Sequence, residues 1–205
     1  MALFDVDSQL VFYGAYHSNR VNVLIHILCV PLILWSAQVL LADVPLPSSI
    51  VGFFTSLGVP THISINPYLS FTLNFPSLFT LVYITYYFLL EPFAALLYLP
   101  QFTLSLLTAT SFAETRAAHL TEAGVVHAVC WIAQFIGHGV AEKRAPALLD
   151  NLVGAIVLAP FFVHLEILFA LGYRPDMYKR VHNGIGKEIT RIKKEEGDKR
   201  RAKEQ

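Results

Sequence analysis

The residues from Val21 to Thr115 contain no lysine and no arginine. A soluble fold of that length needs basic side chains on its surface, whereas the hydrocarbon core of a bilayer disfavours them. Over the whole chain, 55% of the residues are hydrophobic and 15% are charged, against roughly 25% charged in an ordinary soluble domain. The sequence therefore predicts an integral membrane protein.

The charge balance and the cysteines exclude other classes of protein. Lys and Arg total 15 and Asp and Glu total 15, so the formal net charge is zero. A protein that binds nucleic acid by neutralising phosphates needs a basic excess, so we expect no nucleic-acid partner. Cys29 and Cys130 each lie in an apolar run and far from any CxxC spacing, which argues against a disulfide framework or a thiolate zinc site.

Five apolar segments approach the length of about 20 residues that a membrane-spanning helix needs. They are Val21–Ala42, Phe75–Leu90, Pro92–Phe112, Thr121–Ala141 and Leu148–Gly172. We expect an all-α, polytopic helical bundle with about four spanning helices. Gly154 and Pro160 interrupt the last segment, which predicts a broken or re-entrant fifth element. A full fifth crossing is the alternative.

Basic residues close to the ends of spans indicate which ends stay in the cytosol. Arg20, the pair Lys143 and Arg144, and the basic C-terminal residues are assigned to that side, so both termini are expected to be cytosolic. This divides the chain into a membrane-embedded catalytic domain, residues 1–172, and a charged cytosolic tail, residues 173–205. The tail lacks an apolar stripe typical of a packed helix and is expected to be solvated.

Ionisable side chains inside membrane segments are functional candidates, because burying them in lipid is costly. Asn22 and His26 are four residues apart and therefore share one face of the first predicted span. His17 lies nine residues before His26, half a turn out of phase at about 100° per residue. One continuous helix cannot direct both histidines to one point, so we expect a break near Tyr16–Asn19, whose residue types favour breaking and capping a helix.

The fourth predicted span carries a ridge of polar residues on one helix face. Its members follow a spacing of 3, 4 and 4 residues: Trp131, Gln134, His138 and Glu142. His127 shares the face but lies about 16 Å from His138 along the helix axis, too far to bind one ion with it. His127 is therefore expected to join helices instead. His26 and His138 both lie near cytosolic ends of their spans, at the same membrane depth.

Three imidazoles and a carboxylate at one membrane depth predict a metal site formed by His17, His26, His138 and Glu142. This donor set suits non-haem Fe(II) with open positions, and zinc fits almost as well. The HExxH signature of zinc proteases and the clustered histidine boxes of diiron desaturases are absent from the sequence. The sequence therefore disfavours a protease or a desaturase.

Two motifs and a short later segment carry a resemblance to a known family. They read Phe12-Tyr13-x2-Tyr16-His17-x4-Asn22-Val23-x-Ile25-His26-x4-Pro31, then Trp131-x2-Gln134-Phe135-x-Gly137-His138-Gly139-x2-Glu142-Lys143-Arg144-x-Pro146-Ala147-Leu148, then Leu158-Ala159-Pro160. From about Asp7 to Tyr173 the chain resembles the iron-dependent 2-hydroxy fatty acid dioxygenases, which are membrane proteins of the endoplasmic reticulum. The second motif is the more specific of the two.

The resemblance implies Fe(II) as cofactor and fatty acid alpha-oxidation, including phytosphingosine breakdown, as the role. A long-chain 2-hydroxy acid reacts with O2 to give CO2 and the fatty acid one carbon shorter. The family's essential histidines correspond to His17, His26 and His138, while a ligand or base role for Glu142 is our inference. The chain departs from the family in its insert from Leu46 to Pro76 and in Ser18-Asn19-Arg20, where an Asn-Pro pair is common.

Four further residues are candidates for supporting the metal or the substrate: Asn22, Gln134, Lys143 and Arg144. Lys143 and Arg144 are most simply topology signals, and the alternative is that they hold a substrate carboxylate. Two other functions stay open at this point. One is a zinc-dependent membrane lipid hydrolase in which Glu142 acts as general base. The other is a non-enzymatic scaffold or transporter whose histidines join helices.

Overall fold

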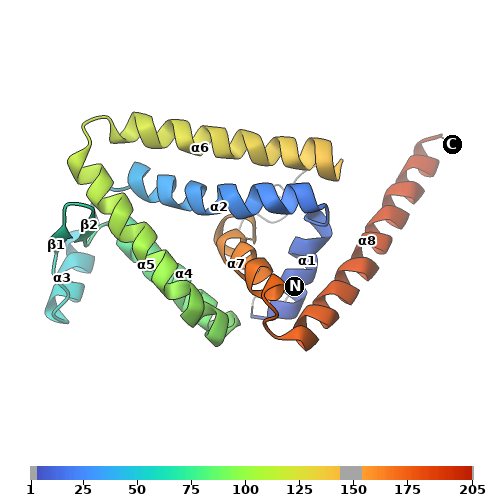
Figure 1. Ribbon diagram of the computed structural model, residues 1–205, viewed down its shortest axis with the longest axis horizontal. Helices are drawn as coiled ribbons and strands as arrows, with labels where there is room; N and C mark the ends of the chain where they lie inside the picture. The colour runs from blue at the N-terminus through green and yellow to red at the C-terminus, as the bar shows by residue number, and fades with distance from the viewer. Residues whose placement is uncertain (1–3, 144–153, 205) are drawn as a thin grey trace. The chain divides into compact units, whose positions relative to one another are not determined.

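The computed structural model describes residues 4–143 and 154–204. The α-helices are α1 (Val6–Tyr16), α2 (Arg20–Leu40), α3 (Ser48–Ser56), α4 (Phe75–Leu90), α5 (Pro92–Thr115), α6 (His119–Ile136), α7 (Ala159–Ala170) and α8 (Pro175–Glu204). Two π-helices, η1 (Gly137–Glu142) and η3 (Gly154–Leu158), and two strands, β1 (His62–Asn66) and β2 (Leu69–Thr72), complete the described elements (Figure 1). The predicted all-α architecture is confirmed, with a small hairpin added.

Among the described residues, three helices are long and apolar enough to cross a membrane. They are α2, α5 and the continuous helix His119–Glu142, which comprises α6 and η1. The apolar helix α4 has 16 residues, fewer than a crossing requires. The helix pair Ile156–Ala170 and Pro175–Ala202 is bent by 118° and counts as one further span only if the bent pair is a broken span. The start of the predicted fifth segment, at Leu148, lies outside the described residues.

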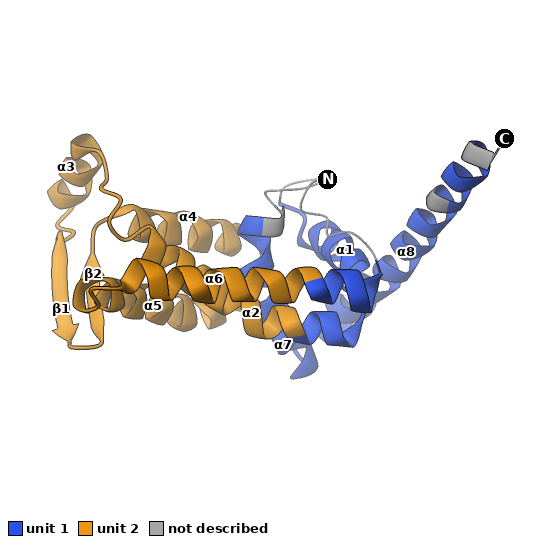
Figure 2. Cartoon of the chain, turned by 90° about the horizontal axis from the view of Figure 1, so that it is seen from above, with its two compact units in different colours: residues 1–24, 136–205 blue, residues 25–135 orange. Residues whose placement is uncertain are grey.

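The chain forms two compact units (Figure 2). Unit 1 comprises Met1–Leu24 and Ile136–Gln205, and unit 2 comprises Ile25–Phe135. Both boundaries fall inside continuous helices, the first within α2 and the second at the end of α6. A few residues on either side of each boundary are therefore held in register by helical hydrogen bonds.

Polar contacts join the apolar helices of unit 2. Gln38 of α2 donates to the Thr80 hydroxyl of α4 (3.0 Å) and accepts from the Ser105 hydroxyl of α5 (2.6 Å). Ser36 of α2 contacts the His127 ring of α6 at 2.9 Å. Because no water can satisfy such groups in a bilayer, each must find a partner on a neighbouring helix. These contacts fix α2, α4, α5 and α6 against one another.

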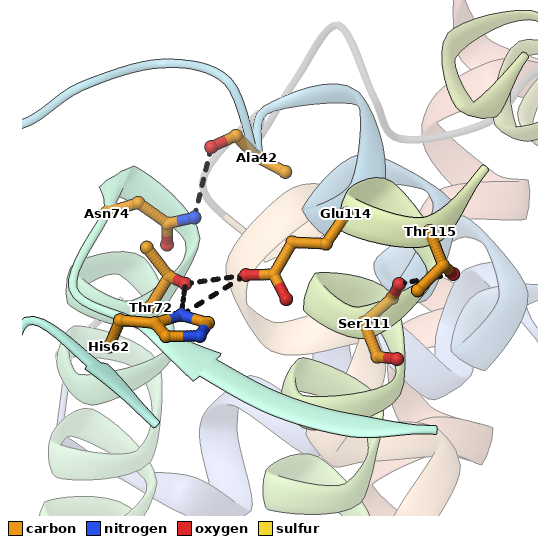
Figure 3. Close-up of polar contacts among 7 residues, drawn as sticks. All are labelled: Ala42, His62, Thr72, Asn74, Ser111, Glu114 and Thr115. Carbon is orange, nitrogen blue, oxygen red and sulfur yellow. Dashed lines mark hydrogen bonds and ion pairs between the residues drawn. The ribbon is translucent and has the colours of Figure 1, made fainter. Parts of the chain in front are cut away.

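The insert that follows α2 contains α3 and an antiparallel hairpin of β1 and β2. Thr72 of β2 donates to the Glu114 carboxylate of α5 (2.8 Å) and contacts His62 of β1 (3.0 Å), as Figure 3 shows. Asn74 donates to the Ala42 carbonyl (3.0 Å) and caps α4. These contacts tie the hairpin to the last turn of α5 and to the residues between α2 and α4.

In unit 1, α8 packs against α1, so the prediction of a solvated tail is wrong for the first turns of α8. Met177 and Val181 are buried, and Gly184 lies so close to Val11 that an added Cβ would stand 2.5 Å from a valine methyl. Arg180 forms an ion pair with Asp7 at 2.9 Å. The apolar residues of α8 that face α1 recur every four residues. They were not predicted as a stripe because charged residues stand between them.

Candidate functional site

The break between α1 and α2 places His17 outside either helix, as predicted. The backbone N–H of His17 closes the last turn of α1 by donating to the Gly14 carbonyl (3.2 Å). The Asn19 side chain accepts from the Val21 N–H (2.9 Å) at the start of α2, as asparagine commonly does at a helix N-terminus. Because α1 ends and α2 begins within four residues, the direction of the His17 side chain is not set by the face of either helix.

Tyr13 orients the imidazole of His17. The two rings stack with centroids 3.9 Å apart, and the Nδ1 of His17 lies 2.8 Å from the Tyr13 carbonyl. A carbonyl can only accept, so Nδ1 carries the proton and Nε2 carries the lone pair. Metal-binding histidines are commonly held through such a bond from the other ring nitrogen. Burial raises the pKa of the Tyr13 phenol, so the stacked ring stays neutral.

His138 lies in η1, where the continuous helix His119–Glu142 changes from α-helix to π-helix. Its side chain is buried, and its ring centroid is 4.8 Å from that of His17 in an edge-to-face arrangement. π-turns within α-helices are often found at functional sites. Both residues belong to unit 1.

The three predicted histidines form the one group of three or more potential ligands found among residues 4–143 and 154–204. Ring nitrogens of His17, His26 and His138 all lie within 4.8 Å of one another. His26 follows Asn22 by one turn on the continuous helix α2. The donor set fits a metal: three imidazoles are typical ligands of iron, zinc and copper, and the His17 tautomer presents a lone pair.

Glu142 is not a member of this group and makes other contacts. Its carboxylate accepts hydrogen bonds from the Asn19 backbone N–H (2.6 Å), the Ser18 hydroxyl (3.2 Å) and the Asn22 amide (3.4 Å). The predicted helix ridge is changed by η1, because a wider turn alters where a residue four positions after His138 points. Sequence reasoning did not identify Ser18 and Asn19 as partners of Glu142. The signal that could have found them is their residue types, which commonly cap helices.

The other predicted residues have distinct surroundings. Gln134 is 7% exposed, and its amide nitrogen has no hydrogen-bond partner among the described residues. Lys143 is exposed and ends η1 with φ of 53°, and its N–H donates to the His138 carbonyl. Arg144 lies outside the described residues. His127 joins α2 to α6, since the Trp131 indole donates to it at 2.9 Å and Ser36 contacts its other nitrogen.

The fold and this group define a helical membrane protein with one histidine just before a helix long enough to span and two histidines on such helices. The chain belongs to the Mpo1-like family, described as 2-hydroxy-palmitic acid dioxygenase Mpo1-like, whose model matches residues 3–171. It is 38% identical over 179 residues to the 2-hydroxy-palmitic acid dioxygenase MPO1 of Saccharomyces cerevisiae, covering 84% of this chain and 85% of that protein. No solved structure matches the chain.

Proposed function

We propose that this protein is an Fe(II)-dependent dioxygenase of long-chain 2-hydroxy fatty acids. In this proposal His17, His26 and His138 are the ligands of the metal. The observation that carries the proposal is the three-imidazole group in a chain that is 38% identical to a 2-hydroxy-palmitic acid dioxygenase. His17, His26 and His138 would hold the ion, and Fe(II) in non-haem oxygenases reacts at positions that the protein ligands leave open.

The overall reaction balances without another reductant. R-CH(OH)-COOH and O2 give R-COOH, CO2 and H2O, and the substrate supplies all four electrons that reduce O2. Bound Fe(II) supplies the redox chemistry that lets O2 react with a closed-shell hydroxy acid. The reaction therefore requires no 2-oxoglutarate, haem or flavin.

The protein's own residues orient the metal ligands and bind the substrate. The Tyr13 carbonyl holds His17 in one tautomer, which keeps the lone pair on Nε2. Gln134, one turn before His138, donates from its buried amide to the carboxylate or 2-hydroxyl of the substrate. A buried amide without a partner is costly, and the substrate satisfies it. Lys143, at the same end of the span, and Arg144, the next residue in the sequence, are candidates for attracting the anionic substrate.

The substrate is amphiphilic, which agrees with a site near the end of a span. The metal group lies near the first residues of α2 and the last residues of the helix His119–Glu142. At that depth the carboxylate stays near water while the acyl chain remains in hydrocarbon. We place the protein in the endoplasmic reticulum membrane with both termini in the cytosol, and its role in alpha-oxidation and phytosphingosine breakdown.

A metal add-back experiment tests the proposal. The purified protein is stripped with a chelator and supplied with Fe(II) or Zn(II), and O2 uptake is measured with 2-hydroxypalmitate. We expect uptake with Fe(II) alone in the wild type and none in a folded His138→Ala variant. Uptake that is absent with both metals, or hydrolysis of lipid esters supported by Zn(II), would overturn it.

A further inference from the structure

The carboxylate of Glu142 receives its hydrogen bonds from a segment more than 100 residues earlier in the chain. Ser18, Asn19 and Asn22 supply the hydroxyl, backbone and amide donors. A fourth bond runs beside them, from the Asn19 amide to the Ala141 carbonyl (3.0 Å). All these residues belong to unit 1. We call this group of bonds the Glu142 latch.

The latch connects the parts of the chain that carry the metal-site histidines. Asn19 lies two residues after His17, and Glu142 lies four residues after His138 at the end of η1. Asn22, fully buried, lies one turn before His26 on α2. Each bond to Glu142 thus fixes a point close to one histidine against the helix that carries another.

The bond from the Asn19 backbone N–H to Glu142 is the shortest of the latch, at 2.6 Å. The Asn19 N–H precedes the first turn of α2, where backbone N–H groups have no intrahelical acceptor. A carboxylate at a helix N-terminus is stabilised both by this donor and by the positive end of the helix dipole. Hydrogen bonds to a charged group are roughly twice as strong as neutral ones. Glu142 is therefore suited to holding the start of α2 in place.

We propose that Glu142 is a positioning residue, which holds the break between α1 and α2 against η1 so that His17, His26 and His138 converge. This inference rests on the proposed function, because it assigns the converged histidines to the metal. It replaces the role of metal ligand that the sequence suggested for Glu142. Its oxygens accept hydrogen bonds from three donors, which is the environment expected of a structural carboxylate.

Three substitutions separate a positioning role from a ligand role. Glu142→Gln keeps an oxygen that can accept from Asn19, whereas Glu142→Ala removes every acceptor. Ser18→Ala removes one donor and leaves the carboxylate. Glu122→Gln is the matched control, because Glu122 is also a carboxylate of the same continuous helix and pairs with Arg116 at 2.8 Å instead.

The first readout needs no metal. Hydrogen exchange of the Asn19 amide is measured in the metal-free protein, and we expect at least tenfold faster exchange in Glu142→Ala, a smaller effect in Glu142→Gln and none in Glu122→Gln. The second readout is Co(II) binding by absorption spectroscopy. Affinity should fall about tenfold to a hundredfold in Glu142→Ala, the range found for residues that orient metal ligands, with the Co(II) spectrum unchanged and partial rescue by glutamine.

The outcomes distinguish the possibilities. A changed Co(II) spectrum in Glu142→Gln, with Asn19 exchange unaltered, would make Glu142 a ligand and overturn the positioning role. Unchanged exchange and affinity in both variants would overturn it as well. His138→Ala tests the proposed function separately: if that variant binds Co(II) like the wild type, the metal assignment fails, while Asn19 exchange still reports on the latch. If Glu142→Ala does not fold, Glu142→Gln and Ser18→Ala give the same comparison.

Discussion

The contact between α1 and α8 predicts opposite effects for two glycines that lie two residues apart. An alanine Cβ at Gly184 would stand 2.5 Å from a Val11 methyl, whereas one at Gly186 would meet nothing within 4 Å. Replacing glycine by alanine inside a helix gains up to about 1 kcal/mol. Gly186→Ala is therefore expected to stabilise the protein slightly.

At Gly184 the gain is opposed by overpacking. Val11 is β-branched and stiff, so relief requires a shift of α1 or α8, and forced methylenes typically cost about 1–3 kcal/mol. The two variants should therefore differ by about 1–3 kcal/mol in free energy of unfolding. For a chain of this size that corresponds to roughly 2–4 °C per kcal/mol in Tm.

The assay is thermal unfolding of both purified variants in the same detergent. Gly184→Ala should unfold at lower temperature than Gly186→Ala, and adding Val11→Ala should restore most of the difference by making room for the new methyl group. Equal midpoints for the two single variants would refute the packing of α8 on α1. So would a failure of Val11→Ala to rescue Gly184→Ala.

Three further predictions concern single side chains. Gln134→Leu should raise KM for the 2-hydroxy acid and leave metal affinity unchanged, as steady-state kinetics and Co(II) titration will show; unchanged KM would remove Gln134 from the substrate site. His127→Ala should lower Tm, because Ser36 and Trp131 lose their partner, yet keep the bound metal; metal loss without a fall in Tm would contradict this. Hydrogen bonds from Ser8 lower the pKa of Asp5. Asp5 caps the N-terminus of α1, so its stabilisation is present above the aspartate's unfolded pKa and is lost as pH falls through the lower folded value. Asp5→Ala should therefore flatten the dependence of Tm on pH in that range, and an unchanged dependence would contradict the cap.

Much of the site could be predicted from the spacing of the polar residues along the helices. Asn22 and His26 fall on one face, and His17 falls half a turn away, so the chain had to break between them. The structure has that break, with α1 ending at Tyr16 and α2 starting at Arg20. Hydropathy and the positions of the basic residues also predicted that His26 and His138 lie near the ends of their spans.

The rest depended on features that a period of 3.6 residues does not encode. The predicted ridge from Trp131 to Glu142 requires an α-helix throughout. The π-helix η1 changes the direction in which Glu142, the last residue of the ridge, points. The apolar stripe of α8 was missed because its members, Met177, Val181 and Ile185, are separated by charged and polar side chains. Ile185 belongs to the stripe because it lies against Gly14 of α1. The hairpin in the insert is bound by Thr72 and Glu114, a contact between residues 42 positions apart.

The central claim is tested most directly by the stoichiometry of the reaction in Fe(II)-loaded protein. Oxygen uptake, CO2 release and formation of the fatty acid one carbon shorter are measured together with 2-hydroxypalmitate, in the wild type and in His138→Ala. The account predicts equal amounts of all three in the wild type and none in the variant. Oxygen uptake without CO2, or equal turnover by folded His138→Ala, would contradict it.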